Sequence, residues 1–478
     1  MPKARLQTGQ TVDGFLIGDF VYKGGMATLW KVTKAGCDLP LLMKVPVMTE
    51  GEDPAAIVGF EMEQMILPRL SGQHVPKFIA AGDFAVQPYI VMEHVEAPSL
   101  LPKLDHLPLA WADVVALGAK IAVALHDLHT QHVVHLDLKP SNVLCRANGE
   151  VVLVDYGLSH HDQLPDLMVE EFRLPYGTAP YMAPEQVMGV RHEPRSDQFA
   201  LGVLMYFFAT GTRPFGDPQR LKGLKRRIWQ DPVPPRKLNP DIPPWFQEII
   251  LRCLEVNPSR RYPTASQLAF DLLHPEQVRL TGRATKLKQD PWTAVWKRRF
   301  NEDASPLQLS SIKQQISNAP IIMVAIDLSE GAEPVHDKLR QMTEQVLATM
   351  PQARVACINV LKQNRVTLDT TLDENGESKH VNRLVGLKNW ANALGLSNGK
   401  VTFHVLEAVN PADAILEYAQ NISADHILMG ARTNSTLRSL LGSVSGVVAA
   451  QAPCTVTVVR AQNSKSAFAG GEQNAGLS

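Results

Sequence analysis

The chain has 478 residues, enough for about three domains of average size or for two of unequal size. Hydrophobic residues make up 45% and charged residues 20%, which is ordinary for a globular protein that buries hydrophobic cores. The net charge of −1 argues against a general nucleic-acid-binding role, because such a role needs a surplus of basic residues.

The first 100 residues are expected to form a small lobe rich in strands. Apolar, β-branched runs bounded by turn residues predict strands at 15–22, 27–32, 39–47 and 89–95. A helix is expected at about 54–70. From residue 110 the apolar residues lie three and four apart, and helices are expected to dominate 196–273. This pattern predicts a larger helical lobe after the small one.

The second half of the chain has a different pattern. From residue 319, five apolar runs alternate with helical stretches, which predicts an α/β doubly wound five-stranded parallel sheet covered on both faces. The stretch before it is basic and is predicted to be a linker or, alternatively, a docking patch for an acidic surface or a phosphate. The predicted organisation is a first domain at 12–275, a basic linker at 276–318, a second domain at 319–461 and a disordered tail at 462–478.

The cysteines and the apolar stretches bear on the cellular setting. No two of the five cysteines form a Cys-x-x-Cys pair, which argues against a zinc site and a disulfide framework. We therefore expect a reducing, cytoplasmic environment. No apolar run follows the basic N-terminus, and the longest apolar stretch, 199–211, is too short to cross a bilayer. Neither a signal peptide nor a membrane span is expected.

The sharpest motif of the first domain is His-Leu-Asp-Leu-Lys-Pro-Ser-Asn at 135–142, with Asp155 opening an Asp-Tyr-Gly turn thirteen residues later. Phosphoryl transfer needs an acid to orient the acceptor hydroxyl, and Asp137 fits that role. It also needs oxygen ligands for Mg²⁺, which Asn142 and Asp155 could supply. Lys139 could neutralise charge on the moving phosphoryl group.

Two features upstream fit the binding of phosphates. Lys44 lies in a predicted strand and Glu63 in the predicted helix, and a lysine held by a glutamate can grip phosphate oxygens. The turn that contains Tyr22, Gly24 and Gly25 joins two predicted strands. Its glycines would let backbone amides approach the phosphates.

This order of motifs resembles the eukaryotic-like (Hanks-type) serine/threonine protein kinases of bacteria over about residues 12–275. The resemblance implies the α+β bilobal protein-kinase fold, with ATP and Mg²⁺ as cofactors. It implies that Asp137 is the catalytic base, that Lys44 and Glu63 form an ion pair, and that Asn142 and Asp155 are the metal ligands. The implied nucleotide site also contains the glycine-rich turn, Met92 at the back of the adenine pocket and a hinge at 93–95, that is, Tyr22, Gly24, Gly25, Lys44, Met92, Glu93, Val95, Asn142 and Asp155.

The resemblance also implies three supporting residues. Glu185 and Arg261 would pair to brace the large lobe, and Asp197 would anchor the catalytic loop. Tyr22 and Ala27 depart from the family pattern, because both stand where it has glycines.

Leu136 is a second departure, since it replaces an arginine that normally meets a phosphate on the activation loop. The sequence between His160 and Gly177 contains no Ser or Thr. These two absences predict an activity that does not depend on activation-loop phosphorylation.

The second domain resembles the universal stress protein domain over about residues 319–461. Some members bind ATP through a spaced glycine motif, and here Asp327, Gly430, Gly442 and Ser443 would form the corresponding nucleotide site. Thr433 replaces one glycine of that motif. A dimerisation or docking module with the same fold is the alternative.

Together these patterns predict an ATP- and Mg²⁺-dependent kinase that phosphorylates Ser and Thr residues of protein substrates and of itself. The second domain would link this activity to stress and could build a homodimer. The alternative is a pseudokinase or nucleotide-sensing scaffold that binds ATP without efficient turnover. Neither reading involves nucleic acid or a membrane span.

Overall fold

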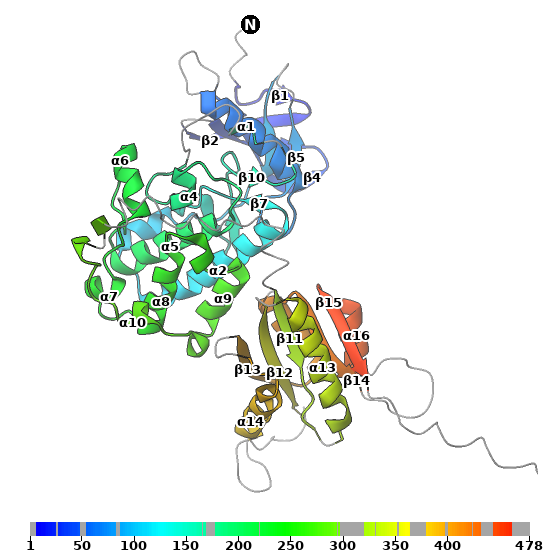
Figure 1. Cartoon of the computed structure of the whole chain (residues 1–478). Helices are drawn as coiled ribbons and strands as arrows, with labels where there is room; N and C mark the ends of the chain where they lie inside the picture. Colours follow the sequence, from blue (N-terminus) through cyan, green and yellow to red (C-terminus); the bar gives the residue numbers. More distant parts are fainter. Residues whose placement is uncertain are drawn as a thin grey trace, which may run out of the picture. The chain divides into compact units, whose positions relative to one another are not determined.

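The computed structural model describes residues 6–24, 27–47, 54–82, 87–164, 166–168, 177–218, 220–293, 295–296, 320–329, 331–350, 353–363, 379–396, 400–422, 424–431 and 443–460. The chain divides into two compact units, Met1–Ser317 and Asn318–Ser478. Figure 1 labels the helices and strands of each unit.

The small lobe of the first unit is built on an antiparallel sheet with the order β1-β2-β3-β4-β6-β5. Its strands are β1 (Thr11–Val12), β2 (Phe15–Lys23), β3 (Ala27–Lys34), β4 (Cys37–Pro46), β5 (Phe78–Ala81) and β6 (Ile90–Glu93). Along β2 the buried Phe15 and Ile17 flank the exposed Leu16, so one face of the sheet covers a core. Helix α1 (Pro54–Ile66) and the short η1 (Leu67–Arg69) follow β4. The predicted strands and helix of this lobe are confirmed.

The large lobe is mostly helical, and its main core continues into α1 and β6 of the small lobe. Its longer helices are α2 (Trp111–Thr130), α5 (Arg195–Thr210), α8 (Pro244–Cys253) and α9 (Ala265–Leu273). Shorter helices are η2 (Leu101–His106), η3 (Pro140–Asn142), α4 (Pro184–Val187), α6 (Leu221–Leu224), η4 (Lys225–Ile228), α7 (Pro235–Leu238), η5 (Pro258–Arg260), η6 (Pro275–Gln277) and α10 (Gly282–Thr285). Two small antiparallel pairs complete the lobe, β7 (Val133–Val134) with β10 (His160–His161) and β8 (Val143–Cys145) with β9 (Val151–Leu153).

Helix α5 explains the apolar stretch at 199–211. Almost every residue of this helix is buried in the core of the large lobe, so its apolar character serves packing. Within the described part of the chain, every helix is too short or too polar to cross a membrane.

Residues at the start of the predicted linker contact the large lobe. Helix α10 packs on α8, and Arg283 donates to Glu248 and Glu255. Thr281 adds hydrogen bonds from its amide and its hydroxyl to Glu248. The domain boundaries stay a prediction. Residues 294 and 297–318 of the predicted linker and the whole predicted tail at 462–478 lie outside the described residues.

The second unit is a five-stranded, fully parallel sheet with the order β13-β12-β11-β14-β15. The strands are β11 (Ile321–Ala325), β12 (Arg354–Lys362), β13 (Val401–Ala408), β14 (His426–Ala431) and β15 (Thr455–Arg460). The helices are α13 (Glu333–Thr349), α14 (Lys379–Asn392), α15 (Pro411–Asn421) and α16 (Ser443–Gln451). This confirms the predicted doubly wound fold.

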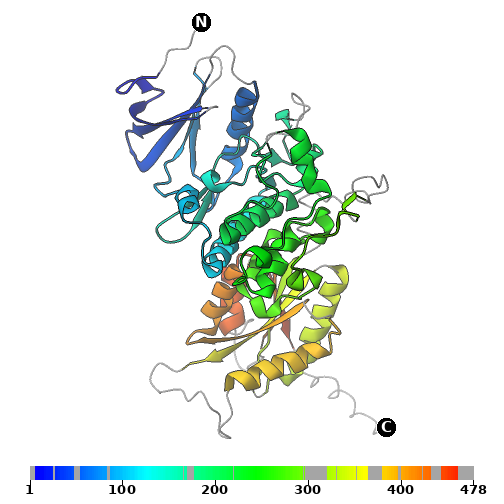
Figure 2. The same ribbon diagram turned by 90° about the vertical axis from the view of Figure 1, so that its left-hand side faces the viewer.

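The order of the strands places two helices on each face of this sheet. The strands β12 and β13 are added on one side of β11, and β14 and β15 on the other. Because the direction of strand addition reverses at β11, right-handed crossovers put α13 and α14 on one face and α15 and α16 on the other. Figure 2 shows the two pairs on opposite sides of the sheet. Arg340 of α13 lies over the Trp390 ring of α14, and α15 packs on α16. The carboxyl ends of β11 and β14 meet at this reversal, where doubly wound sheets bind ligands.

Asp425, just before β14, ties the start of β11 to its neighbour. Its carboxylate accepts a hydrogen bond from Ile321 N at 2.8 Å, and its own amide donates to Ile321 O at 2.9 Å. Burial raises the pKa of Asp425 to about 6, and the hydrogen bond from Ile321 lowers it by less. The folded chain therefore holds this proton to a higher pH than the unfolded chain does.

We expect Asp425→Asn to stabilise the second unit at pH 7.5. A raised folded-state pKa gives stability that is complete below about pH 4 and is lost as the pH rises through about 6. The amide carries no charge, so the gain should reach about 2 kcal/mol at pH 7.5 and shrink at pH 4. Calorimetric unfolding of the intact chain at both pH values measures it. Asp337→Asn, whose side chain is 89% exposed, is the control, and a variant less stable than wild type at pH 7.5 would contradict the assignment.

Candidate active site

Lys44 joins two acids that come from different elements of the first unit. Its Nζ donates to Glu63 Oε2 of α1 at 2.5 Å and to Asp155 Oδ1 at 2.9 Å. Asp155 follows β9, so a single ammonium group connects β4, α1 and the turn after β9. Lys44 and Glu63 are largely buried, and the Asp155 side chain is 45% exposed.

Two glycines let α1 approach the turn after β9. A Cβ atom on Gly59 would lie 3.2 Å from Gly157 O, and one on Gly157 would lie 3.1 Å from Gly59 O. Side chains at either position would push α1 away from the Asp-Tyr-Gly turn. Because Glu63 is one helical turn beyond Gly59, this close approach helps to bring its carboxylate to Lys44.

The charges of this triad reinforce one another. The Lys44 ammonium, against the opposing effect of burial, lowers the pKa of Asp155 to about 2. Burial alone would lower the pKa of Lys44, but the charges of Asp155 and Glu63 outweigh it and hold that pKa above its usual range. At neutral pH Asp155 is therefore a carboxylate and Lys44 an ammonium.

The loop at 135–142 is held by a buried acid at the start of α5. Asp197 accepts hydrogen bonds from His135 N at 2.9 Å and from Leu136 N at 2.8 Å. Its third contact is His129 Nε2 at 2.9 Å. Leu136 has a φ of 63°, a left-handed conformation that is costly for leucine, and the amides bound by Asp197 support it.

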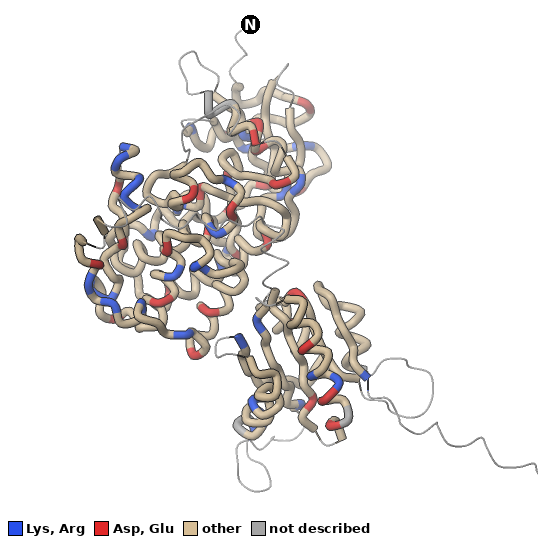
Figure 3. The backbone as a smooth tube through the Cα atoms, viewed as in Figure 1, with Lys and Arg blue, Asp and Glu red and all other residues tan. Residues whose placement is uncertain are grey.

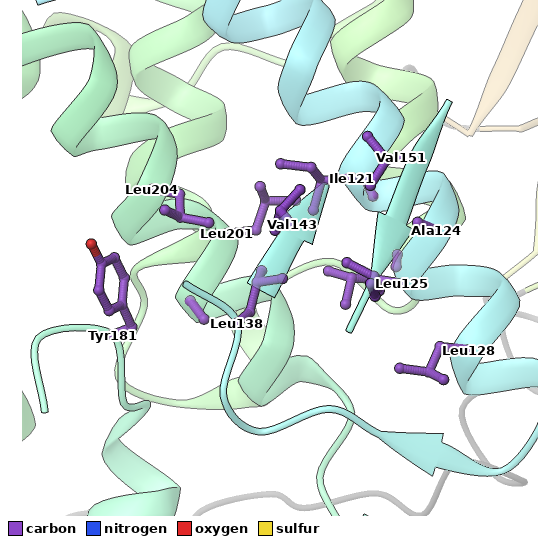
Figure 4. Packing of buried hydrophobic residues seen from close by; sticks show 14 of the residues in the cluster. Ile121, Ala124, Leu125, Leu128, Leu138, Val143, Val151, Tyr181, Leu201 and Leu204 are labelled. Atoms are coloured by element: carbon purple, nitrogen blue, oxygen red, sulfur yellow. The ribbon is translucent and has the colours of Figure 1, made fainter. Parts of the chain in front are cut away.

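Hydrophobic packing fixes the middle of the same loop. Leu138 is fully buried and points into the large-lobe core among Val143 of β8, Leu125 of α2 and Leu201 of α5 (Figure 4). The residues on either side of it, Asp137 and Lys139, carry the polar groups. Packing of Leu138 in the core therefore fixes the positions of the neighbouring Asp137 and Lys139.

Asp137 is 4% exposed, and both of its carboxylate oxygens accept hydrogen bonds. Oδ2 accepts from Lys139 Nζ at 2.5 Å and from Asn142 Nδ2 at 3.2 Å. Oδ1 accepts from the amide of Thr178 at 3.0 Å and from its hydroxyl at 2.7 Å. Asn142 thus presents its amide group to Asp137, while its Oδ1 accepts from Ser141 Oγ at 3.1 Å.

The loop is also tied to the residue before Asp155. Val154 N donates to Asn142 O at 3.0 Å, and His135 Nε2 lies 3.2 Å from Val154 O. The structure therefore connects Asp137, Lys139 and Asn142 to Asp155, and through Asp155 to Lys44 and Glu63. Their catalytic and metal-binding roles stay predictions.

The predicted nucleotide-site residues of the small lobe lie on β2 and around β6. Tyr22 is 59% exposed, Gly24 N donates to Ala27 O at 2.9 Å, and Gly25 lies outside the described residues. Met92 and Val95 are buried. Glu93 accepts from Arg146 Nη2 at 2.6 Å and from the Lys77 amide at 3.2 Å, so its side chain has a structural role and any nucleotide contact would come from its backbone.

The second unit places two of its predicted nucleotide-site residues where the strand order reverses. Asp327 follows β11, and its carboxylate accepts from the amide and hydroxyl of Ser329. Gly430 lies in β14, where a Cβ atom would come within 2.7 Å of Val335 Cγ1 of α13, so helix packing already accounts for this glycine. Gly442 lies outside the described residues, and Ser443 begins α16. Nucleotide binding here stays a prediction.

Sequence reasoning did not identify the contacts that hold Leu136 and the loop at 177–182. Gln186 of α4 donates to Leu136 O at 2.8 Å, and Arg227 donates to the carbonyl oxygens of Ala179 and Met182. Arg227 is 1% exposed although it ends a cluster of basic residues whose other members are exposed. Figure 3 shows basic residues gathered along α6 and η4, of which Lys222, Lys225 and Arg226 are exposed.

Comparisons with known proteins agree on the family. Residues 23–273 match the protein kinase domain family, and residues 319–460 match the universal stress protein family. A probable serine/threonine-protein kinase of Clostridium perfringens is 26% identical over 272 residues, which cover 57% of this chain and 38% of that protein. The serine/threonine-protein kinase PknL of Mycobacterium tuberculosis is 28% identical over 333 residues, which cover 69% of this chain and 78% of PknL.

Among solved structures, the Mycobacterium tuberculosis PknI kinase domain aligns with a TM-score of 0.44 and 22% identity, and the alignment covers 57% of this chain and 100% of that domain. The chain spans about two fifths of the length of some curated relatives, 38% of the Clostridium perfringens protein and 43% of PknB of Mycolicibacterium smegmatis. The kinase match nevertheless covers more than half of the present sequence. The chain therefore belongs to the protein kinase family, and its second unit matches the universal stress protein family.

Proposed function

We propose that this chain transfers the γ-phosphoryl group of ATP to Ser and Thr hydroxyls of protein substrates, itself included. The observation that carries the proposal is the Asp137 carboxylate, buried and held by Lys139 and Asn142 in one loop. Asp155, kept ionised by Lys44, is connected to that loop. The relatives named as serine/threonine-protein kinases support the choice of acceptor.

Asp137 would orient the acceptor hydroxyl and accept its proton. The hydrogen bond from Thr178 Oγ1 to Asp137 Oδ1 supports this role, because an incoming Ser or Thr hydroxyl would make a contact of the same kind. Lys139, 2.5 Å from the other carboxylate oxygen, would neutralise charge on the transferring phosphoryl group. Lys44 would contact the phosphates with an ammonium that Glu63 and Asp155 hold in place.

The residues present suit Mg²⁺, which the protein kinase family uses with ATP. Magnesium prefers oxygen ligands, and the exposed, ionised Asp155 carboxylate and the Asn142 amide oxygen supply them. When bound, Mg²⁺ would offset charge on the phosphate oxygens. Asp155 and Asn142 would hold the ion, while Asp137 remains free to act on the acceptor.

We further infer that the second unit regulates this activity in response to stress, by sensing a nucleotide or by forming a homodimer. The match to the universal stress protein family supports this role. A cytoplasmic setting is supported by the five unpaired cysteines, because reduced thiols are typical of that compartment.

The test is phosphate incorporation from labelled ATP with Mg²⁺, with the intact chain and a generic acceptor protein as substrates. Asp137→Asn should lower the rate roughly 10²-fold or more while ATP binding persists, because the amide cannot accept the proton. Asp105→Asn, an exposed aspartate of the same unit, is the matched control. Equal rates in wild type and Asp137→Asn would refute the proposal. ATP binding with no incorporation in wild type would favour the scaffold alternative.

A further inference from the structure

One arginine holds the segment after Asp155 at two separate points. Arg191 follows α4 in the large lobe, and its Nη2 donates to Leu158 O at 3.0 Å and to Ser159 O at 3.2 Å. Its Nε donates to Asp166 Oδ2 at 2.8 Å. The two side chains are only 12% and 13% exposed, so this ion pair is shielded from water.

Asp166 has a second hydrogen-bond partner within the segment. Its Oδ2 also lies 2.9 Å from His160 Nδ1 of β10, a strand that pairs with β7 directly before the catalytic loop (Figure 1). Burial works to raise the pKa of Asp166, but His160 and Arg191 outweigh it and the pKa is lowered. Asp166 is therefore an ionised hub that joins Arg191 to β10.

The position that carries an arginine in many kinases carries no charge here. Leu136 is 4% exposed and packs against Val134. The sequence from His160 to Gly177 has no Ser or Thr to phosphorylate. An arginine–phosphate contact of the usual kind therefore lacks its arginine and its acceptors, whereas an arginine–carboxylate contact is present nearby.

We propose that Arg191 and Asp166 form a positioning pair that holds residues 158–164 in the arrangement needed for phosphoryl transfer, without any phosphate on the activation segment. The inference rests on the kinase activity proposed above. Arg191 binds the carbonyls three and four residues after Asp155, so it limits how far the predicted metal ligand can move. It touches neither Asp137 nor Lys44 through any hydrogen bond given for the described residues, and acts through the backbone of the segment.

The carboxylate of Asp166 does the work of a phosphate in this arrangement. A phosphate would gather cationic side chains around an added negative charge. Asp166 gathers Arg191 and His160 in the same way, with a charge that is encoded in the sequence. The segment would then be ordered as soon as the chain folds.

The experiment measures phosphoryl transfer by the intact chain in Arg191→Ala, Arg191→Lys, Asp166→Asn and the double variant Arg191→Ala/Asp166→Asn. We expect Arg191→Ala and Asp166→Asn each to lower kcat about 10- to 100-fold, because each removes charge-assisted hydrogen bonds that hold the segment. The double variant should lose less than the two single losses combined, since both changes break the Arg191–Asp166 contact. Arg191→Lys should recover part of the rate through the pair with Asp166.

The control is Arg260→Ala, an arginine of the same lobe whose side chain is 70% exposed, and it should leave the rate unchanged. Hydrogen exchange of peptides spanning 158–168 gives a readout that does not need catalysis, and exchange should rise in Arg191→Ala but not in Arg260→Ala. Phosphatase-treated wild type should keep its full rate with no lag.

Three results would overturn the inference. They are a wild-type rate in Arg191→Ala, independent losses that add up in the double variant, or an obligatory phosphate within residues 158–182. If wild type incorporates no more phosphate than Asp137→Asn, the proposed kinase function itself has failed. In that case unchanged exchange in Arg191→Ala would refute the positioning role separately.

Discussion

Lys44→Met should lower phosphoryl transfer by about 10²- to 10³-fold, because it removes one preorganised cation from the site of phosphate charge. The change breaks two ion pairs at once, to Glu63 at 2.5 Å and to Asp155 at 2.9 Å. Methionine keeps the length of the side chain, so packing between β4 and α1 is little disturbed. The measurement is the initial rate with labelled ATP and Mg²⁺ at pH 7.5.

The same variant should change the pH dependence of the remaining activity. Lys44 is the main reason that the pKa of Asp155 lies near 2. Without it, that pKa should rise towards its ordinary value of 3.8, since burial of Asp155 works in that direction. Residual activity should therefore fall, as the pH drops towards 5, more steeply than wild-type activity does.

Lys31→Met, on the neighbouring strand β3, tests for a general effect of removing a lysine, because Lys31 is exposed. Glu63→Gln separates the two ion pairs and should cost less than Lys44→Met, since the contact with Asp155 survives. If Lys44→Met keeps a rate within threefold of wild type and unfolds at the wild-type temperature, Lys44 does not contribute to phosphoryl transfer.

The motifs predicted contacts of the first unit where residues of a particular chemical type stand at a particular spacing. Lys44 and Glu63 were expected to pair, and they do. Two hydrogen bonds could not be predicted in this way, from Thr178 to Asp137 and from Arg227 to the backbone carbonyl of Ala179. Both join residues far apart in sequence, and a contact to a backbone carbonyl leaves no pattern, because every residue has one.

Gly59 is a signal that sequence reasoning could have used. A glycine in the middle of a helix costs about 1 kcal/mol relative to alanine, so it calls for a packing reason. The structure supplies that reason in Gly157. For the second unit, hydrophobic periodicity predicted the strands but not their order, because neighbouring positions in a parallel sheet are set by crossovers rather than by local pattern.

Arg261→Ala should destabilise the first unit by about 3–5 kcal/mol, the usual cost of breaking a buried ion pair from one side. Arg261 and Glu185 are 1% and 0% exposed. The guanidinium binds both carboxylate oxygens, Nη1 to Oε1 at 2.5 Å and Nη2 to Oε2 at 2.8 Å. The measurement is chemical unfolding of the intact chain, followed by a probe in the large lobe.

The size of the effect follows from how completely this guanidinium is satisfied. Its other three N–H groups donate to the backbone oxygens of Glu255, Arg195 and Val256. All five donors are therefore used, and alanine would leave three carbonyl groups and one carboxylate without them. Arg261→Lys offers three donors instead of five and should fall between wild type and alanine.

Arg260 provides the matched control for this prediction. It is the preceding residue, its side chain is 70% exposed, and its nearest acidic oxygen is 4.0 Å away on Glu255. Arg260→Ala should change stability by less than about 0.5 kcal/mol, as expected of an exposed ion pair. Two adjacent arginines of equal charge would then differ several-fold in free energy because only one of them is buried with its partner.

A double variant separates the cost of an unpaired buried charge from the cost of lost packing and backbone contacts. Glu185→Gln combined with Arg261→Met removes both charges, so no carboxylate is left buried alone, and it should lose less stability than Arg261→Ala. A double variant that is less stable than Arg261→Ala would mean that shape and backbone contacts, rather than the unpaired Glu185 charge, dominate. The contact between Glu185 of α4 and Arg261 would then stabilise the large lobe mainly through packing and backbone hydrogen bonds.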